Sequence, residues 1–427
     1  MKTYNYSDLS SSEINTLVQR NVDPANEVRD IVEEILANVK LHGDTALFDY
    51  ALKFEHVLLD KLYLTKSELT ELANGISTEQ KAALDTAYKN IYAFHQTQLK
   101  TEDRVETMPG VTCWRELRPI EKVGLYIPGG TAVLPSTFLM LGIPARIAGC
   151  QEIVVCTPPS KDGKVNPFIA YVALLLNVDK VYLSGGAQAI GAMAYGTETI
   201  PKTDKIFGPG NQFVTKAKTI IQSTTTTAID MPAGPSEVLV IADETANPVF
   251  IAADLLAQAE HGVDSQAVLV TNSANIAQQT IKELTQQLLV LPRADIAAKA
   301  IENSYIVITN DLDEAMQFSN QYAPEHLILA TENWQQIAPK IINAGSVFLG
   351  NLTPESVGDY ASGTNHTLPT SSYAKAYSGV SVDSFVKKIT FQHITPDGIR
   401  NIGPTVEILA ALEGLQAHKN AVTVRMK

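Results

Sequence analysis

The first part of the chain carries apolar residues at helical spacing. Asp23-Pro24 is typical of a helix N-cap followed by proline at the first helical position, and Gly43 is a natural helix end. Between them the apolar positions are Val28, Ile31, Val32, Ile35, Leu36 and Val39. This pattern predicts an amphipathic helix.

A second long helix is predicted to start at Ser77, which forms a capping box with Gln80. One stripe of this helix consists of Leu84, Tyr88, Ile91 and Tyr92. His95 continues the stripe, and we interpret it as a packed or half-exposed helix histidine rather than a ligand.

From about Val123 the pattern changes to short apolar runs that alternate with helical stretches. The runs cover residues 152–159, 179–186, 204–211 and 236–243, with a helical stretch at 166–178 between the first two. Strand, helix and strand in this order imply parallel pairing through a right-handed crossover. The block from Val123 to Val238 is therefore predicted to be a Rossmann-type sheet domain.

A second α/β block follows, beginning with the helical stretch 246–262. Further apolar runs occur at 267–271, 305–309, 327–331 and 346–350. Residues 351–372 are polar and predict a long loop without structure of its own, a kind of segment that is usually functional or disordered. The last fifty or so residues are too short to bury a core alone, so we expect them to pack on another domain or subunit.

Composition limits the classes of function. At 427 residues the chain has room for two or three domains. A net charge of -13 without any basic run argues against nucleic acid or an anionic membrane as a partner. Three cysteines do not make a disulfide framework, and neither a signal peptide nor a membrane span is evident. We expect a soluble, cytoplasmic protein.

Two pairs of residues in the α/β blocks have ligand or acid–base chemistry. Gln258 and His261 are three positions apart at a predicted helix end, which is a half-site for zinc or an ordinary solvated helix end. Glu325 and His326 lie between a helix and a strand, as a general-base pair or as an exposed charged turn. Each pair taken alone favours the ordinary alternative.

Three further polar residues lie toward the C-terminus. Asp359 is in the predicted polar loop and is a metal ligand or a turn former. His418 and Glu413 follow the apolar stripe of the last helix, where surface positions are the simpler explanation. HExxH and CxxC motifs are absent from the sequence, so ordinary metallopeptidase and zinc-ribbon sites have no support.

Two glycine turns precede predicted helices and could receive a phosphate. One contains Gly185-Gly186 with Gly191, and the other is Gly208-Pro209-Gly210-Asn211. Neither matches the literal dinucleotide fingerprint, so each is also compatible with a simple tight turn. Cys113, Cys150 and Cys156 lack a local activating pattern, and we interpret Cys150 and Cys156 as small core residues.

Taken together, the segments resemble the histidinol dehydrogenase family over nearly the whole chain. The matching segments, in order, are VGLYIPGG, GGAQAIGAMAYGT, FGPGNQFVTKAK, AIDMPAGPSE, LLAQAEHG, APEHL, GNLTPESVGDYASGTNH and LEGLQAHK. So many ordered matches are far more specific than any single motif above.

The resemblance implies a role for each candidate residue. Its zinc ligands correspond to Gln258, His261, Asp359 and His418, and its catalytic acid/base pair to Glu325 and His326. Substrate contacts are implied for Ser236, Gln258, His261, His326, Asp359, Glu413 and His418. NAD contacts are implied for Tyr126, Gln188 and Asn211.

The resemblance also implies the reaction and the assembly. The family oxidises L-histidinol to L-histidine through the aldehyde with two NAD+, using Zn2+, as the last step of histidine biosynthesis. It implies a homodimer in which the C-terminal segment, with Glu413 and His418, reaches the partner's active site. Alternatives are a paralogous dehydrogenase of another amino alcohol, a zinc hydrolase, and a binding module with a structural metal.

The expected fold is α/β, with two Rossmann-like α/β/α domains and a small helical and extended tail used in dimerisation. Residues 1–122 are expected to join 239–376 in the first domain. The second domain, 123–238, is expected to be inserted between these halves, and 377–427 to form the dimerisation segment.

Overall fold

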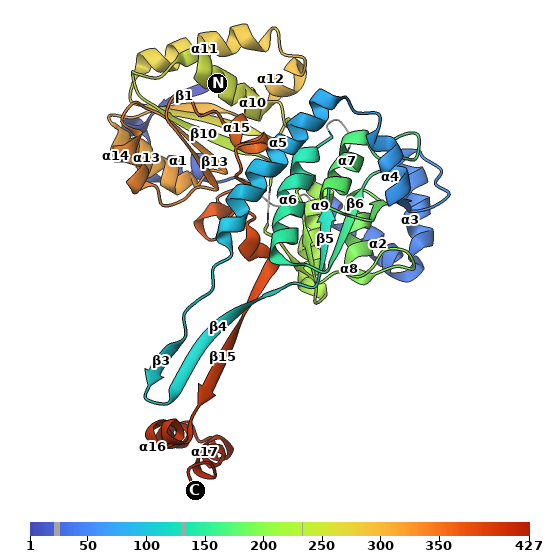
Figure 1. Cartoon of the computed structure of the whole chain (residues 1–427). Coiled ribbons are helices and arrows are strands. Elements are labelled where there is room, and N and C mark those ends of the chain that lie inside the picture. The colour runs from blue at the N-terminus through green and yellow to red at the C-terminus, as the bar shows by residue number, and fades with distance from the viewer. Residues whose placement is uncertain (21–25, 130–132, 233) are drawn as a thin grey trace.

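A computed structural model of the chain describes residues 1–20, 26–129, 133–232 and 234–427. Two six-stranded sheets flanked by helices make up the body, and a long three-stranded arm projects from it (Figure 1). The prediction of an α/β fold with parallel sheets is thereby confirmed. The proposed helix start at Asp23-Pro24 lies outside the described residues.

The first sheet is parallel throughout. Its strands, in spatial order, are β1 (Lys2–Asn5), β12 (Tyr305–Ile308), β11 (Gln266–Thr271), β10 (Glu237–Ala242), β13 (His326–Ala330) and β14 (Ser346–Leu349). One face packs on α10 (Pro248–Ala259), α11 (Ala274–Leu288) and α12 (Ala294–Glu302). The other packs on α1 (Ser11–Val18), α13 (Leu312–Tyr322) and α14 (Trp334–Ile337). Alternate residues of β10 enter the two cores, as expected for a strand buried on both faces.

The second sheet has an antiparallel edge strand on an otherwise parallel core. Its order is β2 (Tyr63–Thr65), β7 (Lys180–Leu183), β6 (Glu152–Thr157), β5 (Lys122–Tyr126), β8 (Lys205–Phe207) and β9 (Ala228–Ile229). The crossover helices are α6 (Pro135–Ala148), α7 (Pro167–Leu175), α8 (Gly186–Tyr195) and α9 (Gln212–Thr224). β10 in the first sheet and β5 in the second are central strands. From each of them the next two strands in the chain are added on one side and the following two on the other, which is the doubly wound pattern.

The N-terminal helices pack differently from our expectation. They are α2 (Asn26–His42), α3 (Asp44–Tyr50), α4 (Lys66–Ala73) and α5 (Thr78–His95), and their apolar faces enter the core of the second sheet. Only the described N-terminal stretch 1–20, with β1 and α1, joins the first sheet. An apolar stripe specifies which face of a helix is buried but not which sheet covers it, so the placement of these helices with 239–376 was wrong.

The predicted polar loop 351–372 is also more ordered than expected. It begins with the short helix α15 (Glu355–Tyr360), whose Gly358 lies so close to the Phe348 ring that an added Cβ would be 2.5 Å from it. Further on, the Asn365 side chain donates a 2.6 Å hydrogen bond to the Met140 carbonyl on α6. The segment is therefore packed between the two sheets and is not a free loop.

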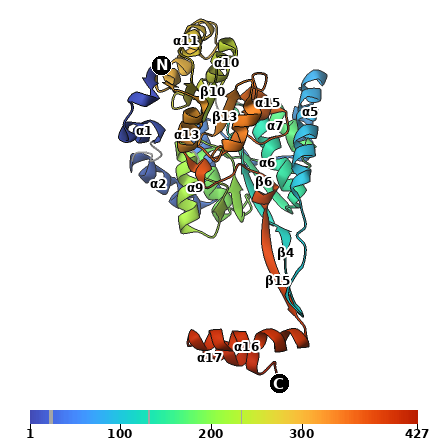
Figure 2. The same cartoon turned by 90° about the vertical axis from the view of Figure 1, so that its left-hand side faces the viewer.

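The arm consists of β3 (Val105–Met108), β4 (Val111–Pro119) and β15 (Val386–Ile394), all antiparallel. It carries α16 (Pro396–Leu412) and α17 (Gln416–Thr423) at its tip, well away from the body in both views (Figures 1 and 2). In the part of the chain that the structure describes, α16 and α17 contribute no residue to the three hydrophobic cores of the body. No helix among the described residues is long and apolar enough to cross a membrane.

Candidate active site and metal centre

The candidate acid/base pair lies at the amino edge of the first sheet. Glu325 directly precedes β13 and His326 is its first residue, and both are buried, with exposures of 5% and 3%. Glu237, the first residue of the neighbouring β10, donates its backbone N–H to Glu325 Oε2 at 2.9 Å. His326 Nδ1 lies 3.3 Å from the Glu237 carbonyl and 3.7 Å from Glu325 Oε2. The alternative of an exposed charged turn is thereby excluded.

Burial and neighbouring charges shift the pKa values of this pair. Burial raises the pKa of Glu325 to about 8, although His326 and the Glu237 N–H oppose the shift. Burial alone would lower the pKa of His326, but the carboxylates of Glu355, Glu325 and Asp359 raise that pKa well above its ordinary value. Both pKa values are therefore raised, and strongly perturbed pKa values in one buried cluster are characteristic of functional sites.

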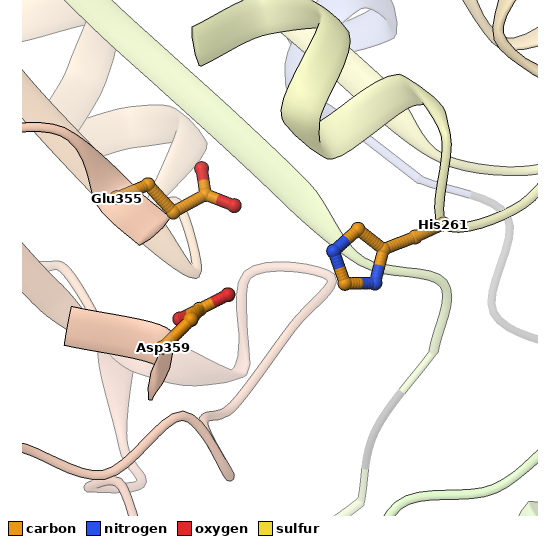
Figure 3. Close-up of side chains that lie close together, drawn as sticks. All are labelled: His261, Glu355 and Asp359. Atoms are coloured by element: carbon orange, nitrogen blue, oxygen red, sulfur yellow. The ribbon is translucent and has the colours of Figure 1, made fainter. Parts of the chain in front are cut away.

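Potential metal ligands gather beside this pair from two elements. Gln258 is in the last turn of α10 and His261 follows it, while Glu355 and Asp359 are one turn apart on α15. Ligand atoms of His261, Glu355 and Asp359 all lie within 4.8 Å of one another, and Figure 3 shows both carboxylates on the side facing the imidazole. His326 Nε2 lies 3.3 Å from Asp359 Oδ1, which joins the two groups of residues.

The donor set fits a divalent cation. Gln258 is fully buried, and neither of its amide atoms has a hydrogen-bond partner in the described part of the chain; the same holds for Glu355 Oε2. Burial raises the pKa of Glu355 to about 8. Unsatisfied buried oxygens are costly, and a cation would satisfy them. Imidazole nitrogen with carboxylate and amide oxygens suits zinc and related metals.

Of the other predicted site residues, one lies near this centre and two lie on the arm. Ser236 directly precedes β10, so it lies next to Glu237. Glu413 and His418 are exposed at the tip of the arm and lie far from the centre of their own chain (Figures 1 and 2). The structure therefore brings Gln258, His261 and the residues of α15 together but does not bring the tail to them.

Sequence reasoning missed Glu237 and Glu355. Glu237 is a charged residue at the head of an otherwise apolar strand, and this anomaly was a usable signal. Glu355 precedes Asp359 by four positions, which is helical spacing, but the segment was expected to be a loop. His366, to which the sequence analysis assigned no role, links α15 to α6. Its Nδ1 is 2.9 Å from the Asp359 carbonyl and its Nε2 is 2.8 Å from Thr137 Oγ1.

The candidate NAD residues lie at the carboxyl edge of the second sheet. Tyr126 is the last residue of β5, and its hydroxyl accepts a 3.1 Å hydrogen bond from the Gly186 N–H at the start of α8. Gln188, 3% exposed, lies in the same first turn. Asn211 caps α9 after β8, and its Oδ1 accepts from two backbone N–H groups. In doubly wound sheets the crevice beside the central strand is where ligands bind.

The cysteines have the structural role that the sequence suggests. Cys150 and Cys156 are buried and unpaired, and burial raises the pKa of both thiols, that of Cys150 to about 12. A buried thiol with a raised pKa is a poor nucleophile. Cys113 on β4 is partly buried and also free. These positions give no support to a thiol-based aldehyde oxidation.

Comparison with known proteins decides the family. The family model described as histidinol dehydrogenase matches residues 18–426. Histidinol dehydrogenase from Bacteroides thetaiotaomicron is 57% identical over 96% of this chain and 96% of its own length. The chloroplastic enzyme of Arabidopsis thaliana is 53% identical over 100% of this chain and 92% of its own. The chain belongs to the histidinol dehydrogenase family.

A solved structure agrees with this membership. Histidinol dehydrogenase from Elizabethkingia anophelis superposes with a TM-score of 0.96 at 54% identity, covering 100% of this chain and 98% of that one. An acetylating aldehyde dehydrogenase from Geobacillus thermoglucosidasius reaches a TM-score of 0.50 at 14% identity and shares the fold alone. Membership in the histidinol dehydrogenase family makes the chain an NAD-dependent oxidoreductase of histidine biosynthesis. The zinc hydrolase alternative is thereby set aside.

Proposed function

We propose that this chain oxidises L-histidinol to L-histidine through the aldehyde, with two NAD+ consumed in succession. The observation that carries the proposal is the buried pair Glu325–His326, which adjoins a cluster of unsatisfied metal-type ligands in a member of the histidinol dehydrogenase family. This arrangement combines proton transfer with a means of holding a small polar substrate.

Gln258, His261 and Asp359, together with His418 of the partner subunit, would hold zinc. Glu355 offers a further carboxylate at the same place, within 4.8 Å of the ligand atoms of His261 and Asp359. These residues would present zinc to the substrate, and the metal would supply coordination to substrate nitrogens and so orient it. Holding both ends of the substrate keeps the aldehyde from escaping between the two oxidations.

Two residues carry the proton transfers. His326 removes the proton of the alcohol as hydride leaves to the first NAD+. Glu325 activates water for attack on the aldehyde carbon, and a second hydride transfer to another NAD+ gives the acid. Their burial supports these roles, because exclusion of water strengthens each electrostatic interaction of the pair.

The cofactor is assigned to the carboxyl edge of the second sheet. Tyr126, Gln188 and Asn211 are the proposed NAD contacts, since they lie at the ends of β5 and β8 and at the starts of α8 and α9. Backbone N–H groups at these helix starts favour an anionic pyrophosphate.

A homodimer completes the proposal. Ile408, Leu409 and Leu412 at the tip of the arm are 62%, 54% and 78% exposed, which is costly unless another surface covers them. In the dimer, Glu413 and His418 contact the substrate and metal of the partner's site, and Ser236 contacts the substrate within its own chain. Three unpaired cysteines are compatible with the reducing cytoplasm that we propose as the location.

One titration tests the reaction. A limiting amount of L-histidinol with excess NAD+ should yield two NADH per substrate, whereas one NADH or none would contradict the four-electron oxidation. A panel of other amino alcohols distinguishes a paralogous dehydrogenase, which would prefer one of them. Chelation separates the roles of the metal: a substrate-orienting ion leaves a folded, inactive protein, whereas a structural ion leaves an unfolded one.

A further inference from the structure

A buried ion pair lies directly behind the acid/base pair. Arg20 Nη1 is 2.8 Å from Glu237 Oε2, and the two side chains are 11% and 0% exposed. Arg20 comes from the segment after α1, remote in sequence from every candidate site residue. A charge pair held out of water is costly to build unless its geometry is good, so its position next to a reaction centre requires a reason.

Glu237 connects this pair to both catalytic side chains through its main chain. Its N–H donates to Glu325 Oε2 at 2.9 Å, and its carbonyl lies 3.3 Å from His326 Nδ1. Its carboxylate is fixed on two sides, by Arg20 and by the Ser371 N–H, which donates to Oε1 at 2.9 Å. The side chain of Glu237 therefore anchors the peptide groups that orient Glu325 and His326.

Arg20 also binds the turn that follows the candidate metal ligand His261. Its Nη2 donates to the Asp264 carbonyl at 2.8 Å, in the turn that follows His261. One guanidinium thus connects the strand that carries Glu237 with the turn that follows a proposed metal ligand. Arg20 itself contacts neither the acid/base pair nor the candidate metal ligands in any hydrogen bond recorded among the described residues.

We propose that Arg20 and Glu237 form a positioning pair that holds Glu325 in place for the water-dependent oxidation of the aldehyde. This inference rests on the proposed function. The pair acts through the hydrogen bond from the Glu237 N–H to Glu325, so its loss should resemble a weakened form of losing Glu325 itself. A displacement of a catalytic group by about 1 Å can lower the reaction rate ~10²-fold.

The test compares two reactions of the aldehyde in Glu237→Gln and Arg20→Met variants. Aldehyde oxidation with NAD+ needs the activated water, whereas aldehyde reduction with NADH does not. Oxidation should fall ~10²-fold in kcat and reduction less than ~10-fold. Oxidation requires Glu325, which the Glu237 N–H holds at 2.9 Å, whereas reduction requires only His326, whose contact with the Glu237 carbonyl is longer at 3.3 Å. Zinc content and thermal midpoint are measured on each preparation, so that metal loss and unfolding are separated from misplacement.

Tyr322→Phe provides a matched control in the same buried network. The Tyr322 hydroxyl donates to Gln266 Oε1 at 2.7 Å and reaches Glu237 Oε2 only at 3.5 Å. Its loss leaves the shorter contacts of Arg20 and the Ser371 N–H with the Glu237 carboxylate in place. Its removal should lower the thermal midpoint and leave the ratio of oxidation to reduction at the wild-type value. Arg20→Lys, which keeps the charge but loses the second hydrogen bond, should restore part of the ratio.

A wild-type ratio in folded, zinc-loaded Glu237→Gln and Arg20→Met would overturn the inference and leave the pair with a purely structural role. If those two variants do not fold, Arg20→Lys decides: an intermediate ratio supports the inference, and a wild-type ratio contradicts it. Failure of the proposed function itself is recognisable separately, since wild-type protein would then produce no NADH from histidinol.

Discussion

The two sheets of the body share a central strand order, yet their candidate chemistry lies at opposite ends of the strands. In the second sheet, Tyr126 and the turn from Gly208 to Asn211 lie at the carboxyl ends of β5 and β8. In the first sheet, Glu237 and the pair Glu325–His326 lie at the amino ends of β10 and β13.

Local hydrogen bonds join the carboxyl ends of two neighbouring strands of the first sheet. After β10, the Thr245 hydroxyl donates to Asp243 Oδ1 at 2.5 Å and accepts from the Glu332 N–H at 3.2 Å. These bonds connect the carboxyl ends of β10 and β13, where an open doubly wound sheet would bind a ligand. Helix α10 then returns the chain to the amino edge and delivers Gln258 and His261 there.

Both functional edges nevertheless use the same device, a buried ion pair that fixes a peptide group. In the second sheet Lys218 pairs with Asp230, and the two side chains bond to the carbonyl and the N–H of Gly208. In the first sheet Arg20 and Glu237 hold the acid/base pair. The comparison teaches that strand order alone does not decide which edge of a sheet carries the candidate site residues; the segments that flank the strands do.

The largest expected effects are at the amino edge of the first sheet. His326→Asn should lower both oxidation steps ~10²–10⁴-fold, because it removes the proposed proton acceptor. Glu325→Gln should reduce overall histidinol oxidation by a similar factor and leave much of the aldehyde reduction intact. Stopped-flow measurement of each half-reaction checks this, and an overall rate near wild type in Glu325→Gln would remove Glu325 from the mechanism.

At the carboxyl edge of the second sheet, Gly208→Ala should raise the KM for NAD by at least ~10-fold without reducing zinc content. Gly208 has φ +129°, and an added Cβ would lie 2.1 Å from the Tyr126 carbonyl, so the turn must shift. Gly149→Ala is the control: it has φ +86° with nothing within 4 Å, and so adds strain without a clash. Calorimetric NAD binding equal to wild type in Gly208→Ala would contradict the cofactor assignment.

The arm is a third region, and the next prediction tests whether its His418 acts in the active site of the partner subunit. Co-expressed His326→Asn and His418→Ala chains should regain about a quarter of wild-type activity, although each variant alone is nearly inactive. Random pairing makes about half of the dimers hybrid, and each hybrid has one unaltered site if His418 serves the partner. Activity that stays at the level of the separate variants would show that His418 does not act in the other subunit.

The smallest effect is expected for Tyr126→Phe. It removes the hydroxyl that accepts from the Gly186 N–H at 3.1 Å, an interaction worth about 1 kcal/mol, or ~5-fold in NAD affinity. Zinc content and the kcat of histidinol oxidation at saturating NAD+ should not change. A loss of metal in this variant would show that the two edges are coupled more tightly than their separate anchoring suggests.

Much of the local structure was predictable from sequence. The helix opened by Ser77 is present as predicted, and His95 on it is fully buried. Its predicted stripe is buried or half-buried at Leu84, Tyr88 and Ile91, but Tyr92 is 41% exposed. Strands 152–157 and 180–183, with the helix between them, also match, because a buried parallel strand reads as a continuous apolar run. The helices of 26–95 were assigned to the wrong sheet, since periodicity carries no information about the partner surface.

The family-specific residues were found only because many ordered segments matched at once; locally, Gln258 and His261 resembled an ordinary helix end. The sequence alone determined the elements, the buried faces and the identity of most candidate ligands. Only the tertiary structure decided that Glu237 meets Glu325, 88 positions away, and that Arg20 pairs with Glu237. Such contacts join the ends of elements that are distant in the chain. Hydrophobic patterning indicates which face of an element is buried, but it does not indicate which other element that face or its ends will contact.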